Sequence, residues 1–158
     1  MVLPQSFVKQ HGGGEVYKVN VNKLGSQSGV EYLRIVSNYD KTITDNDKKI
    51  NFRNFGSGIV NTKSRNSWVR NCTMLHFFKS VVMIGDNTLN ITVRDCKSLK
   101  PVGPFGGGFC YPLFINGGTG HLVYQCYTED GRHDFVGGAR TMWALCICKV
   151  HCCAGRNF

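Results

Sequence analysis

Arg132, His133 and Asp134 are consecutive in the chain and bring together a cation, an imidazole and a carboxylate. Such a group can move protons and offset a developing negative charge, which are the tasks of acid–base and electrostatic catalysis. We therefore predict these three as catalytic residues. A structural interpretation stays open, in which Asp134 accepts hydrogen bonds from turn amides and Arg132 pairs with it or with Glu129.

The elements that must position these residues are indicated by a short sequence motif, here called the phrase, that occurs three times. It is a β-prone run, then Asn, Asp or Gln, then Cys, and its copies are Val69-Arg70-Asn71-Cys72, Val93-Arg94-Asp95-Cys96 and Val123-Tyr124-Gln125-Cys126. After each cysteine a second β-prone run ends in glycine, at Gly85, Gly117 and Gly137. Repeats 24 and 30 residues apart are typical of stacked folds, in which one unit cannot bury its apolar face alone.

The repeat predicts an all-β parallel β-helix in which each copy is one rung. We expect about four to six rungs in one domain, residues 1–158, with an insertion after Cys96 carried in a loop. Residues 29–37 look like an earlier rung with Val36 at the cysteine position, and Cys148 would hold that position in the last repeat, which begins at Trp143. The chain ends at Phe158 within a rung and without a polar cap, so we expect a fragment that is incomplete at its C-terminus.

The formal net charge is +9, which favours anionic partners such as nucleic acid, membranes or acidic polysaccharides. The basic residues are scattered rather than gathered in a run, so we expect no nucleic-acid partner. No stretch approaches the roughly 18 apolar residues that span a bilayer, so we expect no membrane span, and no secretory signal peptide is visible.

Arg70 and Arg94 share a position in the phrase and should stack one rung apart, with Tyr124 next. They would form a basic and aromatic stripe suited to an acidic glycan, unless they are ordinary solvent-facing positions. The neighbouring Asn71, Asp95 and Gln125 could hydrogen-bond to one another along the coil, as side-chain ladders do in stacked strands.

The chain has eight cysteines, of which Cys72, Cys96 and Cys126 occupy the same repeat position. Disulfide geometry between adjacent rungs is demanding, so stacked free thiols are favoured over bridges. Near the C-terminus, zinc is an alternative to an ordinary strand for a second group, Cys146, Cys148, His151, Cys152 and Cys153. For Asp40, Asp45 and Asp47, calcium is an alternative to a solvated loop. We expect neither a cofactor nor a metal.

Residues 29–140 resemble the pectin-lyase-like superfamily of right-handed parallel β-helices, in particular a little-characterised bacterial-type subgroup. The similar phrases are Gly29-Val30-Glu31-Tyr32-Leu33-Arg34-Ile35-Val36-Ser37, Asn66-Ser67-Trp68-Val69-Arg70-Asn71-Cys72-Thr73, Ile91-Thr92-Val93-Arg94-Asp95-Cys96-Lys97-Ser98-Leu99 and Gly131-Arg132-His133-Asp134-Phe135-Val136. The superfamily includes polysaccharide lyases and hydrolases and also non-catalytic adhesins, so the fold alone does not select a function.

The resemblance implies a polysaccharide-interacting protein, either a lyase or a hydrolase that acts on acidic, uronate-containing glycans. In β-elimination Arg132 or His133 would be the base, with Arg140 or Arg94 offsetting the uronate charge. Hydrolysis would need two carboxylates from Glu129, Asp130 and Asp134. We expect Arg70, Arg94, Tyr124 and Arg140 to bind substrate. The alternative is a non-catalytic extracellular matrix or adhesion module. An extracellular location is expected, and the oligomeric state stays open.

Overall fold

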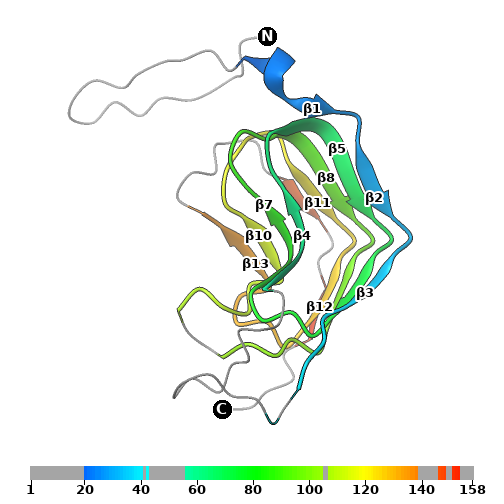
Figure 1. The fold of residues 1–158 in the computed structure, drawn as a ribbon, viewed down its shortest axis with the longest axis vertical. Coiled ribbons are helices and arrows are strands. Elements are labelled where there is room, and N and C mark those ends of the chain that lie inside the picture. Colours follow the sequence, from blue (N-terminus) through cyan, green and yellow to red (C-terminus); the bar gives the residue numbers. More distant parts are fainter. Residues whose placement is uncertain are drawn as a thin grey trace, which may run out of the picture.

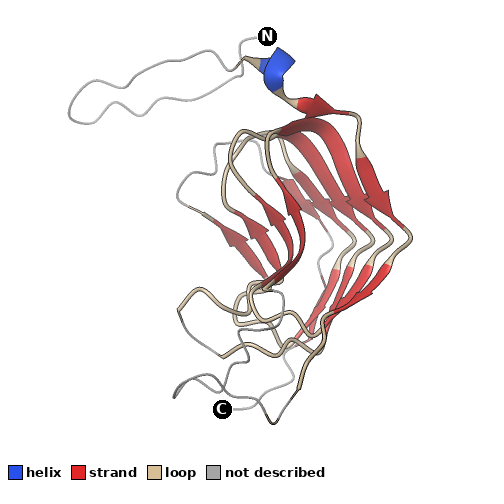
Figure 2. Ribbon diagram, viewed as in Figure 1, coloured by secondary structure: helices blue, strands red, loops and turns tan. Residues whose placement is uncertain are grey.

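The computed structural model describes residues 20–40, 42, 56–104 and 107–138, with the backbone of residues 146–148 and 151–153. Within these ranges the chain winds into a coil of parallel strands, preceded by one 3₁₀ turn, η1 (Val21–Lys23) (Figures 1 and 2). The predicted parallel β-helix is confirmed. Parallel strands need crossover connections, and here each crossover is the rest of one rung.

The strands form three sheets, here called A, B and C, and a complete rung takes one strand from C, then A, then B. Sheet A contains β1 (Gly25–Ser26), β2 (Gly29–Glu31), β5 (Ser64–Arg70), β8 (Leu89–Arg94), β11 (Leu122–Tyr124) and β14 (Cys146–Cys148). Sheet B contains β3 (Arg34–Val36), β6 (Thr73–Leu75), β9 (Lys97–Leu99), β12 (Tyr127–Glu129) and β15 (His151–Cys153). Sheet C contains β4 (Ser57–Asn61), β7 (Ser80–Ile84), β10 (Leu113–Ile115) and β13 (Phe135–Gly137).

One residue with left-handed backbone makes the corner between sheets A and B in each described rung. The φ angles at this corner are +53° at Asn71, +54° at Asp95 and +49° at Gln125, and Tyr32 takes +56° in the first rung. Asn and Asp adopt this conformation at lower cost than most residues because their short polar side chains bond locally. The polar residue of the repeated phrase therefore turns the chain. The expected hydrogen bonds between the side chains of these corner residues are not among those of the described residues, where Asp95 accepts from Arg94 instead. One such bond between neighbouring rungs occurs at another position, where Asn90 Nδ2 donates to Asn66 Oδ1 at 3.1 Å.

Valine and cysteine ladders fill the interior next to this corner. Val30, Val69, Val93 and Val123 pair in register along sheet A, and the last three are at most 1% exposed. The thiols of Cys72, Cys96 and Cys126 are free and buried, as expected. Each thiol contacts the carbonyl two residues earlier and a valine carbonyl of the preceding rung. The contact with Cys126 and burial raise the pKa of the Cys96 thiol, which keeps it protonated as a donor.

The register corrects two placements at the ends of the repeat. Val36 pairs with Leu75, and Arg34 pairs with Thr73, so Leu33 and not Val36 lies opposite Cys72. At the other end Cys148 pairs with Tyr124 and therefore does not continue the cysteine ladder. Both errors have the same cause, because hydrogen bonding between strands sets the register and the spacing of residues along the sequence does not.

His121 joins two rungs from inside the core and is 2% exposed. Its Nδ1 accepts a hydrogen bond from the Ile91 amide at 3.2 Å, so Nε2 carries the proton and donates to the Gly117 carbonyl at 3.1 Å. Burial lowers the pKa of His121, and the hydrogen bond to Gly117 opposes this only in part. Protonation of Nδ1 would turn the acceptor for the Ile91 amide into a donor, so the fold holds His121 neutral.

We expect acid to destabilise the fold through His121. Because the folded-state pKa is lowered, the unfolded chain binds the proton more readily, and the free energy of unfolding falls as the pH drops below about 6.5. Urea unfolding at pH 7.5 and pH 5.0 measures this loss in the wild type and in His121→Gln. The wild-type loss should exceed that of the variant by on the order of 1 kcal/mol, and equal losses would contradict the assignment.

Candidate functional site

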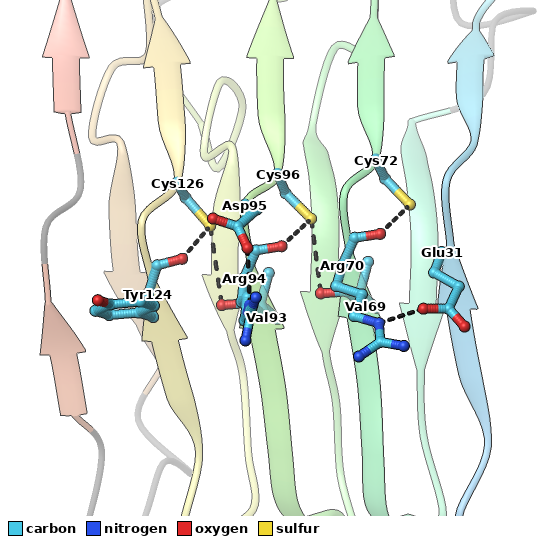
Figure 3. Close-up of polar contacts among 10 residues, drawn as sticks. All are labelled: Glu31, Val69, Arg70, Cys72, Val93, Arg94, Asp95, Cys96, Tyr124 and Cys126. Carbon is cyan, nitrogen blue, oxygen red and sulfur yellow. Dashed lines mark hydrogen bonds and ion pairs between the residues drawn. The ribbon is translucent and has the colours of Figure 1, made fainter.

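Several strands of sheet A place a charged or aromatic side chain at their last position before the corner, and these side chains form a row. The strand register aligns Glu31 with Arg70, Arg70 with Arg94, and Arg94 with Tyr124 (Figure 3). We call Arg70, Arg94 and Tyr124 the arginine stripe. Neighbouring strands lie roughly 4.8 Å apart, so the stripe repeats cationic and aromatic groups at that spacing along the coil. The predicted stacking of these three residues is confirmed.

Both arginines of the stripe are held by carboxylates through the same atom, Nε. Arg70 Nε pairs with Glu31 of the preceding rung, and Arg94 Nε pairs with Asp95 Oδ2 at 2.7 Å. The hydrogen bond that Arg70 donates to Glu31 raises the pKa of Arg70. The Arg70 guanidinium also lies 5.8 Å from the centroid of the Trp68 ring, within the range of a cation–π contact. These contacts fix where the two cations lie.

The arginine stripe keeps donors free for a ligand. The Arg70 and Arg94 side chains are 42% and 50% exposed, and their Nη atoms make no hydrogen bond within the described part of the chain. A guanidinium pairs with carboxylates through two parallel N–H donors, and its charge is permanent. Since each ion pair uses Nε, the Nη edge of both groups stays available. The stripe can therefore bind anionic groups that repeat along a polymer.

A second group of side chains surrounds Tyr111. Tyr111, Arg132 and His133 lie in loops that lead from sheet B into sheet C, and Phe114 lies in β10. The ring centroid of Tyr111 lies 5.7 Å from that of His133 and 5.9 Å from that of Phe114. Arg132 Nη1 donates to the Tyr111 hydroxyl at 3.4 Å. Arg132 and His133 are exposed, and Tyr111 and Phe114 are half-buried. We call these four residues the Tyr111 cluster.

Asp134 makes two hydrogen bonds that support the fold. Its Oδ1 accepts a hydrogen bond from the Thr128 hydroxyl at 2.7 Å, and its carbonyl accepts from the Leu113 amide at 3.2 Å. Thr128 is fully buried, so Asp134 satisfies a donor that water does not reach. The ion pairs of the described residues do not include one between Arg132 and Asp134 or Glu129. Catalysis by Arg132, His133 and Asp134 stays a prediction.

The residues predicted as one catalytic and binding set lie in separate places. Arg94 ends β8 in sheet A, whereas Arg132 and His133 lie beyond β12, so sheet B separates them. Of the carboxylates considered for hydrolysis, Glu129 is in β12 and accepts hydrogen bonds from the Lys100 amide and the Tyr127 hydroxyl. Arg140 lies outside the described residues.

The metal expectations concern residues that are only partly described. Asp40 Oδ1 accepts from both the amide and the hydroxyl of Thr42, at 2.8 and 2.7 Å, and these bonds lower the pKa of Asp40. Asp45 and Asp47 lie outside the described residues, as do the side chains of the C-terminal cysteines and His151. Among the side chains that are described, no three of His, Cys, Asp and Glu gather as metal ligands would. The same residues include no helix of the length and apolarity that a membrane span requires.

Two functional candidates were missed by reasoning from the sequence, Glu31 and Tyr111. Glu31 precedes the corner residue Tyr32 just as Arg70 precedes Asn71, so the repeat contained its signal. Tyr111 had no such signal, because it lies in a loop whose neighbours are set by the path between sheets B and C. Only the folded chain brings it to His133, which is 22 residues away in the sequence.

We expect Asp134 to matter for stability more than Arg132 does. Asp134→Ala leaves the buried Thr128 hydroxyl without its acceptor, which should lower the free energy of unfolding by about 1–3 kcal/mol. Arg132→Ala removes an exposed side chain and should cost about 0.5 kcal/mol or less. Urea unfolding of both variants measures the difference. An Asp134→Ala protein as stable as the wild type would show that this carboxylate is free for another role.

Comparison of the chain with models of protein families, with curated proteins and with solved structures finds no match. Any function must therefore be argued from the geometry of the arginine stripe and the Tyr111 cluster.

Proposed function

We propose that this β-helix binds an acidic polysaccharide along the arginine stripe. The observation that carries the proposal is the register of Arg70, Arg94 and Tyr124, which repeats outward-facing donors from rung to rung. A uronate chain is also periodic, with one carboxylate on each sugar. Two guanidinium groups at the strand spacing of roughly 4.8 Å can meet consecutive carboxylates of an extended chain.

Aromatic rings beside the cations favour a sugar as the partner. Trp68 lies under the Arg70 guanidinium, and Tyr124 continues the row beyond Arg94. A ring next to a charged donor offers a flat apolar surface as well as a hydrogen bond, and a uronate has both an apolar C–H face and a carboxylate. The net charge of +9 adds a general attraction for polyanions, which salt screens.

The carboxylate side chains at the arginine stripe favour binding of the polysaccharide without its cleavage. The two carboxylates at the stripe, Glu31 and Asp95, are held in ion pairs, and Asp134 is held by Thr128. Glycoside hydrolysis needs a pair of carboxyl groups free to act as acid and as base or nucleophile. The stripe itself therefore offers no pair of free carboxyl groups, and a matrix or adhesion module fits it better than a hydrolase does. An extracellular location is part of this proposal.

We expect loss of either arginine to weaken binding to polygalacturonate. Isothermal titration at low salt should show affinities roughly threefold to fivefold lower for Arg70→Ala and Arg94→Ala. Lys23→Ala removes an exposed positive charge from η1 and is the matched control. If all three variants lose the same affinity, net charge accounts for binding and the stripe does not. Single-stranded DNA bound as tightly as polygalacturonate would contradict a preference for uronates.

We expect Asp95→Asn to have the opposite effect. The amide keeps the size of the side chain and suits the left-handed corner, but it no longer neutralises Arg94. Affinity for polygalacturonate should rise roughly threefold. Weaker binding would show that the ion pair positions Arg94 for the ligand rather than competing with it.

A lyase would release unsaturated uronate from polygalacturonate, which absorbance measures. Such a release, if His133→Ala abolishes it, would replace the proposal of binding without cleavage with that of a lyase.

A further inference from the structure

The Tyr111 cluster has the composition of a second anion-binding surface, and it does not belong to the arginine stripe. The ring centroids of His133 and Phe114 lie 5.7 Å and 5.9 Å from that of Tyr111. Arg132 is held at the edge of these rings by the Tyr111 hydroxyl and makes no ion pair among the described residues. A surface with rings and a free guanidinium suits a ligand that has an apolar face and a carboxylate.

Sheet C extends the apolar part of this surface. Phe114 lies in an outward row of the sheet, paired with Met83 on one side and Val136 on the other. These three side chains are half-buried, so the row is partly open along the coil. The Tyr111 cluster is therefore the charged end of an apolar row, whereas the arginine stripe is charged along its length.

The two surfaces face different directions because the chain turns between them. Where one rung contributes residues to both surfaces, the chain leaves sheet A at the arginine stripe and passes through sheet B. It reaches the loops of the Tyr111 cluster only after sheet B. In Figure 1 the corner between sheets A and B lies at the right, and the loops from sheet B into sheet C lie at the bottom. An extended polymer that follows the stripe along the coil runs across the rungs and stays on its own side of sheet B.

We propose that the Tyr111 cluster is a second uronate site and that one copy of this protein bridges two polysaccharide chains. The inference rests on the proposed function and adds that each protein chain has two binding sites for polysaccharide. Two sites on one body that engage different chains produce a network, whereas two sites on one chain produce only tighter binding. Because the sites lie on different sides of the coil, bridging is the outcome that the geometry favours.

Stoichiometry with a short ligand tests the number of sites. Titration of the full chain with a tetramer of galacturonate should give two ligands per chain. Arg132→Glu and Arg94→Glu should each leave one, and the lost site should weaken by about tenfold or more. Arg132 is exposed, so its replacement should not prevent folding, and Tyr111→Phe, which keeps the ring, is the milder second variant. One ligand per wild-type chain, or two in Arg132→Glu, would overturn the proposal.

Light scattering of long polygalacturonate tests the bridging. The wild type should raise scattering at low ratios of protein to polymer, whereas both glutamate variants should bind without raising it. If the wild type binds at one site and only Arg94→Glu removes that binding, the proposed function stands and the second site is rejected. No binding by the wild type would reject both. Scattering that Arg132→Glu leaves unchanged would mean that association of the protein with itself, and not the Tyr111 cluster, joins the polymers.

Discussion

Hydrogen bonding between parallel strands at a fixed register is the constraint on which the other features depend. Once β5 pairs with β8, and β8 with β11, every residue at a given position lies directly beside its counterpart in the next rung. The position of a residue in the repeat then decides whether its side chain is buried or exposed. The valines stack inside, the thiols stack at the corner, and the arginines stack outside. A shift of one residue would exchange the inward and outward rows, because successive side chains of a strand point to opposite faces.

The left-handed corner residue makes this register possible without a loop. Asn71, Asp95 and Gln125 each turn the chain from sheet A into sheet B within one residue, so the last position of sheet A and the first of sheet B keep the same spacing in these rungs. The thiol that follows then reaches the carbonyl two residues back, and in the next rung the pattern repeats. Local conformation and long-range stacking support one another, which is the consistency expected of a sequence that specifies one fold.

Charge on the outer face follows a different rule from packing inside. Stacking places Arg70 beside Arg94, which is electrostatically unfavourable, and Glu31 and Asp95 reduce the cost by pairing with one arginine each. Exposed ion pairs contribute little to stability, so their main effect is to orient the guanidinium groups. The same rungs place Arg132 beside Tyr111 on another side of the coil, where no carboxylate pairs with it among the described residues.

The sequence by itself determined the class of fold, the strands that form the rungs, the free thiol ladder and the alignment of Arg70, Arg94 and Tyr124. These follow from a repeat, and a repeat implies stacking whatever the details of each loop. Only the tertiary structure decided the true register at Val36 and Cys148, the use of Asp134 by Thr128, and the meeting of Tyr111 with His133. Such contacts depend on the length and path of connections between sheets, which vary from rung to rung, and spacing along the chain does not encode where a variable loop brings its side chains.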